Sequence, residues 1–250
     1  MRRGKPLAGG AALSAREVPS IFYLYAAPPA TVGPVATTPN TAARRRGRPR
    51  AEDSVDRAEI LEAALRAFAR YGFEGVSLRT LNRELGVSHN LIYARFGSKD
   101  ELFRAAVDHG FGRMVQRMQT VWDPTLTDPL EQLRLVVRSF LIWSADQPEL
   151  VALMDIEARQ DTERLAYIYK TYIAPALAPV DRLLDHLVAE GRIRQVPLRT
   201  FHFLLAHGAA APFTLVPLAK HFDRRSPLRP RAVREHADLI AELMIEGIRL

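Results

Sequence analysis

The segment 77–99 constrains the fold most, because it holds two short helical patterns joined by a tight turn. Three leucines of the first pattern recur at i, i+3 and i+7 and share one helix face: Leu78, Leu81 and Leu85. Gly86 can adopt the left-handed conformation that ends a helix, and Ser77 and Ser88 are candidate N-caps of the two helices. The segment therefore predicts a helix-turn-helix, whose second helix is shaped to enter the major groove of DNA.

The second helix is expected over residues 88–96, with Ile92 and Phe96 turned inward at i and i+4. Its outer face presents five residues predicted to meet DNA: His89, Asn90, Leu91, Tyr93 and Arg95. The histidine and the asparagine can hydrogen-bond base edges, and the leucine can pack on a thymine methyl group. The tyrosine, the arginine and Lys99 favour phosphate contacts. The alternatives are that Tyr93 is partly core and that Arg95 pairs with an acidic residue.

Taken alone, the two helices could also form an ordinary hairpin of an all-α protein. The flanking sequence favours the DNA-binding reading. An amphipathic helix is expected upstream over residues 57–71, and a further helix begins downstream with Ser98 as its cap and acidic residues in its first turn.

With these flanks, residues 57–106 resemble the DNA-binding domain of the TetR family of bacterial repressors. The matching landmarks are Ala63, Ala64, Phe68, Tyr71, Gly72, Phe73, Ser77, the run 85–88, Ile92, Tyr93, Phe96 and the run 98–102. The sequence departs from the usual pattern at Asn82, where alanine normally packs, and at Leu91, where threonine or a small residue is common. The resemblance implies that Ser77, Ser88 and Arg79 also belong to the DNA-binding surface.

Charge is concentrated around this region. Residues 44–104 carry 13 basic and nine acidic side chains, whereas residues 105–250 carry 18 of each. The run 44–50 reads RRRGRPR, and Arg46, Arg48 and Arg50 are predicted to form an extended arm in the minor groove of A·T-rich DNA. A solvated basic run is the alternative. Residues 1–43, with several prolines and no clean signal-peptide pattern, are expected to form a disordered tail.

Periodic apolar patterns continue through the rest of the chain and predict an all-α fold. Helices are expected near 98–121, 129–146, 148–158, 161–190, 197–220 and 231–249. Prolines at 175, 179, 212 and 217 are expected to kink two of them. The domain boundaries that follow are a tail over 1–43, a basic arm over 44–56, a helix-turn-helix domain over 57–103 and a ligand-binding and dimerisation domain over 104–250.

The resemblance implies two tasks for the second domain. One is dimerisation through the last two helices, which lets a symmetric protein read a palindrome. The other is binding of a small apolar effector by aromatic and soft side chains of the middle helices. The predicted effector residues are Phe111, Met114, Met118, Trp143, Met154, Tyr169, Tyr172 and His207. Ordinary core packing is the alternative for each of them.

These observations predict a cytoplasmic, nucleoid-associated, homodimeric regulator that binds double-stranded DNA and is released from a palindromic operator by a small molecule. No cofactor and no metal are expected: the chain has no cysteine and no phosphate-binding loop, and His202 and His207, five residues apart, do not share an α-helix face. No segment reaches the length of a membrane span. An architectural binder of A·T-rich DNA and an all-α enzyme remain as alternatives.

Overall fold

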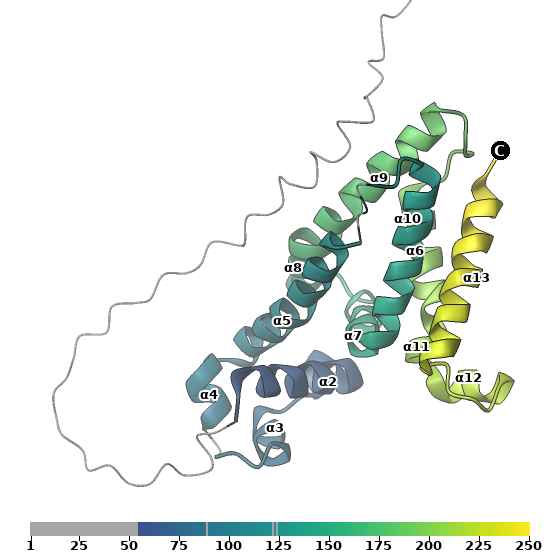
Figure 1. Cartoon of the computed structure of the whole chain (residues 1–250). Coiled ribbons are helices and arrows are strands. Elements are labelled where there is room, and N and C mark those ends of the chain that lie inside the picture. Colours follow the sequence, from purple (N-terminus) through teal and green to yellow (C-terminus); the bar gives the residue numbers. More distant parts are fainter. Residues whose placement is uncertain (1–54, 89, 122, 124) are drawn as a thin grey trace, which may run out of the picture. The chain divides into compact units, whose positions relative to one another are not determined.

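The structure is a computed structural model that describes residues 55–88, 90–121, 123 and 125–250. In this described part of the chain all regular elements are helices, and the only β-type pairing is an isolated bridge between Ile193 and Arg249 (Figure 1). The predicted all-α class is therefore confirmed. Four predicted DNA-binding residues lie outside the described residues: Arg46, Arg48, Arg50 and His89.

The first three helices form the predicted helix-turn-helix domain: α2 (Arg57–Gly75), α3 (Leu78–Glu84) and α4 (Leu91–Phe96). Gly86 has a φ of 65° in the turn between α3 and α4, as the sequence indicated. Gly72, with a φ of 69° and a ψ of 170°, interrupts α2 at the end that the sequence predicts, residue 71, and one further turn follows up to Gly75. Three apolar side chains from α3 and α4 close this small core: Leu81, Ile92 and Phe96.

Helix α5 (Lys99–Gln119) begins where the sequence predicts. The Ser98 hydroxyl accepts the Glu101 N–H, and the Glu101 carboxylate accepts the Ser98 N–H in return, so the capping box is complete. This helix leaves the helix-turn-helix domain and continues into the body of the molecule (Figure 1).

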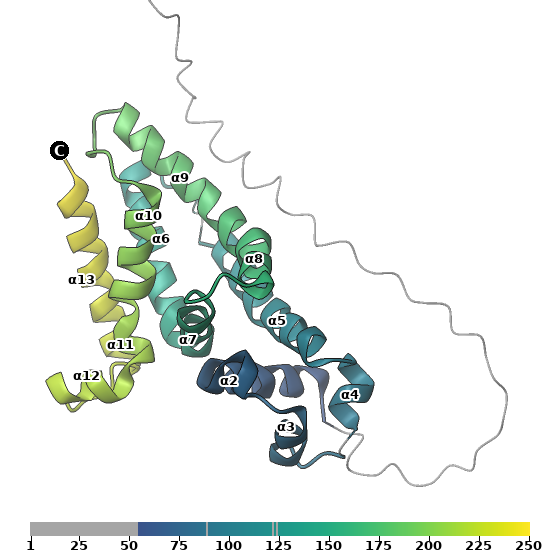
Figure 2. The same cartoon turned by 180° about the vertical axis from the view of Figure 1, so that it is seen from behind.

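The next two helices also match the prediction: α6 (Pro129–Asp146) and α7 (Pro148–Glu157). Helix α2 packs on α5 and on α7, while α6 packs along α13 (Pro230–Ile248), which Figure 2 shows from behind. The body is thus held to the DNA-binding helices mainly through α5 and α7.

The helix expected over 161–190 is confirmed as one continuous helical run, with a change of helix type that the sequence did not predict. The run consists of α8 (Glu163–Ile168), the π-helical turn η2 (Tyr169–Ile173) and α9 (Ala174–Ala189). A proline lacks the N–H for an i to i−4 hydrogen bond, and its ring crowds the carbonyl of the preceding turn. The wider π turn directly before Pro175 is consistent with relief of that crowding, and Pro179 is accommodated inside α9.

The helix expected over 197–220, with kinks at Pro212 and Pro217, is confirmed in position, but it is divided more strongly than expected. It is divided into α10 (Leu198–Phe203), the π-helical turn η3 (Leu204–Ala209), α11 (Ala211–Thr214) and α12 (Val216–Phe222). The chain bends by 82° at Leu215, between the prolines at 212 and 217 that were expected to kink it. In the described part of the chain no single helix is long and apolar enough to span a membrane; the bent pair 198–214 and 216–222 meets that test by length and composition.

Two clusters of buried side chains form the core. One lies among the helix-turn-helix domain, α5 and α7, and the other among α6, α9, α10 and α13. The first contains an aromatic group in which Phe103 meets Phe68 and Phe73 edge to face, at centroid distances of 5.1 and 5.5 Å. This cluster joins the DNA-binding helices to the body by direct packing.

Replacing Phe103 with alanine should lower the free energy of unfolding by about 3–5 kcal/mol, because a fully buried ring is removed and a cavity remains. Urea denaturation followed by circular dichroism measures this. Tyr93→Ala, whose side chain is 67% exposed, is the matched control and should stay within about 0.5 kcal/mol of the wild type. Equal decreases in the two variants would contradict the proposed core.

Candidate nucleic-acid interface

Helix α4 presents a polar and aromatic outer surface on a buried apolar base. Ile92 and Phe96 are 0% and 8% exposed, whereas Tyr93 is 67% exposed and Asn90 and Arg95 are also exposed. Leu91 is half-buried and packs against the core of the domain. The predicted inward pair is therefore confirmed, and the described outer face carries groups that can hydrogen-bond bases or phosphates.

The start of this helix differs from the prediction. Helix α4 begins at Leu91 rather than at residue 88, and its N-cap position is Asn90, so the capping role predicted for Ser88 is wrong. The reason is local: Asn90 has a ψ of −1°, and the Leu91 N–H reaches back to the Ser88 carbonyl in a turn rather than a helix. Ser77 does occupy the N-cap position of α3 but its side chain makes no capping hydrogen bond.

A neighbouring helix supplies the missing cap. Asn82, on α3, is 1% exposed, and its side-chain Oδ1 accepts the N–H of Ile92 at 3.3 Å. Its backbone carbonyl accepts the Val87 N–H at 3.0 Å. Asn82 thus satisfies a donor in the first turn of α4 and holds the turn between the two helices. The role was not predicted; the one signal was an amide at a position where the family usually packs alanine.

Several predicted phosphate-binding side chains already have partners within the protein. A guanidinium N–H of Arg95 donates to the Val55 carbonyl. Lys99 Nζ donates to the Glu74 carbonyl at 3.3 Å and lies 4.4 Å from the centroid of Phe73. Arg79, Ser77 and Ser88 are exposed. The DNA-binding role of all these residues stays a prediction.

The junction between this domain and the body is built around Phe73. The guanidinium of Arg164 lies 3.9 Å from the centroid of Phe73 and pairs at 3.1 Å with Glu157, whose side chain is 3% exposed. A hollow of about 150 Å³ opens beside this group. It is lined by Tyr71, Gly72, Phe73, Glu74, Ile156, Glu157, Gln160, Thr162 and Arg164.

The hollow at this junction contains none of the predicted effector residues. Most of those residues meet elsewhere, where Phe111, Met114 and Trp143 are buried and Met118, Met154 and Tyr172 pack against the same cluster. Tyr169 lies apart from them and is 55% exposed. His207 bonds instead to the Asp155 carboxylate at 2.7 Å. Six of the eight therefore belong to one extended apolar cluster, which also contains the core of the helix-turn-helix domain; their binding role stays a prediction.

A polar group that the sequence analysis missed lies beside this cluster. The hydroxyls of Tyr167 and Tyr172 both donate to one oxygen of Asp108, at 2.6 and 2.7 Å. Burial, followed by the bond to Asp108, raises the pKa of Tyr167 to about 12 and raises that of Tyr172 further. Tyr172 also stacks on Phe111 at 5.2 Å. The pattern had no recognisable sequence signal because its members are 59 and 64 residues apart from Asp108.

The expectation that His202 and His207 lie on different faces is wrong. The π-helical turn η3 has a wider period than an α-helix, and it places the two rings 5.9 Å apart at 82°. Burial, and to a smaller extent the charge of His207, lowers the pKa of His202. Within the described residues no three histidine or acidic side chains gather in a metal-binding arrangement.

Comparison with known proteins assigns the class. The family described as bacterial regulatory proteins, tetR family, matches residues 60–106, and the tetracyclin repressor-like C-terminal domain matches residues 129–244. Together these regions make up more than half of the chain. The chain belongs to the tetR family of bacterial regulatory proteins.

Among curated relatives, the HTH-type transcriptional repressor AcnR of Corynebacterium efficiens is 42% identical over 60 residues, which are 24% of this chain and 32% of that protein. The match thus spans about a third of the relative's length. Among solved structures, the ketosteroid transcriptional regulator KstR2 of Mycobacterium tuberculosis has a TM-score of 0.63 at 18% identity, covering 79% of this chain and 96% of that one. The transcriptional regulator FadR from Bacillus subtilis, in complex with stearoyl-CoA, has a TM-score of 0.55 at 19% identity, covering 76% and 98%. These structures share the fold.

Replacing Asn82 with alanine should leave the Ile92 N–H without its acceptor and lower the free energy of unfolding by about 1–3 kcal/mol. Hydrogen exchange should show faster exchange of the Ile92 amide than in the wild type. Arg83→Ala, at the exposed neighbouring position, is the control and should leave that amide unchanged. Unchanged exchange in Asn82→Ala would rule out the capping role.

A pH dependence follows from His202. Its folded-state pKa is lowered, so the unfolded chain binds more protons, and stability is lost as pH falls below the unfolded value of about 6.5. The melting temperature of His202→Gln should therefore fall less steeply between roughly pH 7.5 and roughly pH 5.5 than that of the wild type. His221→Gln, at an exposed position, serves as the control. Identical pH profiles for wild type and His202→Gln would contradict a lowered pKa of His202 in the folded protein.

Proposed function

We propose that the protein is a sequence-specific DNA-binding transcriptional regulator, a repressor that acts in the cytoplasm as a homodimer on a palindromic operator. The observation that carries the proposal is the α3–α4 pair, in which Asn82 fixes α4 from below and Asn90, Tyr93 and Arg95 are exposed. A rigid helix with a buried base and a polar outer face is suited to the major groove. The similarity of residues in this segment to AcnR, a transcriptional repressor, supports the same function.

Dimerisation is supported by the two faces of α13. One face is buried against the protein's own body through Val233, Ala237, Ala241, Met244 and Ile245. The other exposes Leu239 and Leu243, at 53% and 58%. Exposed leucines in a row favour burial against a second copy, since a symmetric dimer covers such a patch on both subunits.

Effector binding is supported by the apolar side chains gathered along α5. Phe111 and Met114 lie on α5, whose N-cap, Ser98, follows closely after the end of α4. A ligand that displaced these side chains would shift α5, and with it the recognition helix, so ligand binding would favour a state with lower operator affinity. An apolar ligand fits this lining, and the stearoyl-CoA bound by FadR carries an apolar acyl chain, although its coenzyme A part is charged.

The alternatives make different predictions. An architectural protein would bind through the arginine arm to A·T-rich DNA without a dyad. An enzyme would need catalytic side chains beside a site that binds its substrate. The family membership and the exposed face of α4 favour the regulator over both.

Selection of bound duplexes from a random pool, at near-physiological salt, tests the proposal. We expect a palindromic consensus, because two α4 helices related by a two-fold axis read inverted half-sites. Asn90→Ala should lose or relax part of that consensus, whereas Arg199→Ala, in the body, should retain it. Recovery of A·T-rich DNA without a dyad would favour the architectural alternative, and no enrichment would refute DNA recognition.

The dimer interface has its own test. Leu239→Glu combined with Leu243→Glu should convert the dimer to a monomer, because four carboxylates would meet at an apolar surface. Light scattering after gel filtration measures the mass. Leu126→Glu, at an apolar position that is 38% exposed and lies outside α13, should leave the dimer intact. A dimeric double variant would place the interface elsewhere.

A further inference from the structure

A strongly basic segment lies far from the helix-turn-helix in sequence. Residues 220–234 contain six basic side chains and one acidic side chain. The rest of the body, residues 105–219 and 235–250, contains 12 basic and 17 acidic side chains. The basic segment is therefore a local reversal of charge in a body that would otherwise repel DNA.

The segment is exposed and its turn is well defined. The basic side chains Lys220, Arg224, Arg225, Arg229, Arg231 and Arg234 are all exposed. Asp223 accepts hydrogen bonds from the backbone and the guanidinium of Arg225, which lower the pKa of the Asp223 carboxyl to about 2. Ser226 accepts from the Leu228 N–H through its hydroxyl, and its carbonyl accepts from the Arg229 N–H. These bonds shape the turn between α12 and α13.

Four of its side chains are available for an external partner. Arg225 pairs with Asp223, and Arg231 pairs with Glu235 in an exposed i, i+4 contact. The other four, Lys220, Arg224, Arg229 and Arg234, make no ion pair or side-chain hydrogen bond with any of the described residues. Their charges are thus not used to hold the body together.

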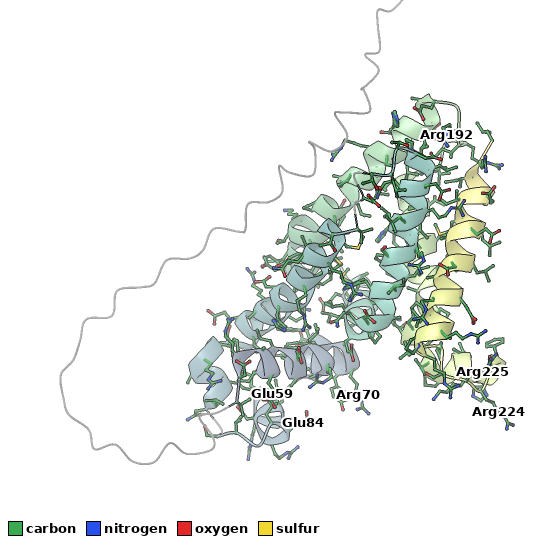
Figure 3. All side chains as sticks on the ribbon, in the orientation of Figure 1. Glu59, Arg70, Glu84, Arg192, Arg224 and Arg225 are labelled. Atoms are coloured by element: carbon green, nitrogen blue, oxygen red, sulfur yellow. The ribbon has the colours of Figure 1, made fainter. Side chains whose placement is uncertain are left out.

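The segment lies at the DNA-binding end of the molecule. Helix α12 packs on α11, α11 packs on α7, and α7 packs on α2 of the helix-turn-helix domain. Figure 3 shows Arg224 and Arg225 at the same end as Arg70 and Glu84 of the α2–α3 region, and Arg192 at the opposite end. The cause is the 82° bend at Leu215, which turns α12 away from the axis of α10 and α11.

We propose that residues 220–234 form a second DNA contact, which binds phosphates of the operator backbone between the two half-sites. The inference rests on the proposed function. In a dimer joined through the exposed face of α13, with the two-fold axis along this helix, the turn that precedes α13 would lie near the axis, and its two copies would face the centre of the palindrome. Arginine and lysine on a fixed turn suit phosphate oxygens, and this contact adds affinity without reading sequence.

The test removes three charges per protomer from this segment. The variant is Lys220→Gln/Arg224→Gln/Arg229→Gln, and the matched control is Arg182→Gln/Arg194→Gln/Arg199→Gln, which removes three exposed charges from α9, the following turn and α10. Fluorescence anisotropy measures the affinity for the selected palindromic duplex over a range of salt concentrations. Circular dichroism and gel filtration confirm that both variants fold and dimerise.

We expect the slope of log affinity against log salt to become shallower by about 0.9 for each phosphate that the variant no longer neutralises. Hydroxyl-radical protection at the operator centre should disappear, with the consensus unchanged. The control should keep the wild-type slope and footprint. Equal slopes in the two variants would overturn the second contact while leaving the proposed function in place. Failure of the wild type to bind any selected duplex would instead refute the proposed function.

An acidic membrane surface is the other partner that this charge could meet. Vesicles of phosphatidylcholine with phosphatidylserine provide the probe. The proposal would be overturned in favour of a membrane contact if the triple variant lost vesicle binding but kept the wild-type dependence of DNA affinity on salt. The second DNA contact would be supported if the wild type did not bind vesicles and the triple variant showed the shallower slope of log DNA affinity against log salt.

Discussion

The structure depends on the packing of Phe73 between the DNA-binding helices and the body. Its ring meets Phe68 and Phe103 and lies under the cations of Arg164 and Lys99. Arg164 is in turn paired with the buried Glu157. A largely buried cation held by a carboxylate and an aromatic face has few alternative arrangements, since loss of Arg164 would leave the buried Glu157 carboxylate unpaired. This group therefore fixes α2 against the α7–α8 connection.

Two routes lead from the body to the recognition helix. One is α5, which carries Phe111 and Met114 in its second half and the capping box beside α4 at its start. The other passes through α7, where Ile156 approaches Gly72 and Asp155 bonds to His207 of η3. A shift of α5 or α7 would move the helix-turn-helix as a unit, because Asn82 ties α3 and α4 together. This arrangement is what an effector-responsive regulator requires.

The sequence predicted the elements whose apolar period was uninterrupted. The turn at Gly86, the capping box at Ser98 and the extents of α6 and α7 follow from local patterns of three to four residues. The π turns η2 and η3 did not, because a change of period by one residue is invisible in an apolar pattern. The hydrogen bonds of Asn82 with Ile92 and of Asp108 with Tyr172 depend on tertiary packing. The sequence therefore predicted the outer face of the candidate site but not the hydrogen bonds that hold the helices behind it.

The central claim is that two copies of α4 read the major groove of one palindromic site. Methylation interference on the selected duplex tests it most directly, because methylation of guanine N7 blocks the major groove and methylation of adenine N3 blocks the minor groove. The account predicts two clusters of guanine interference whose centres are separated by about 10 base pairs or a multiple of that distance. A single cluster, or interference confined to adenine N3, would contradict it.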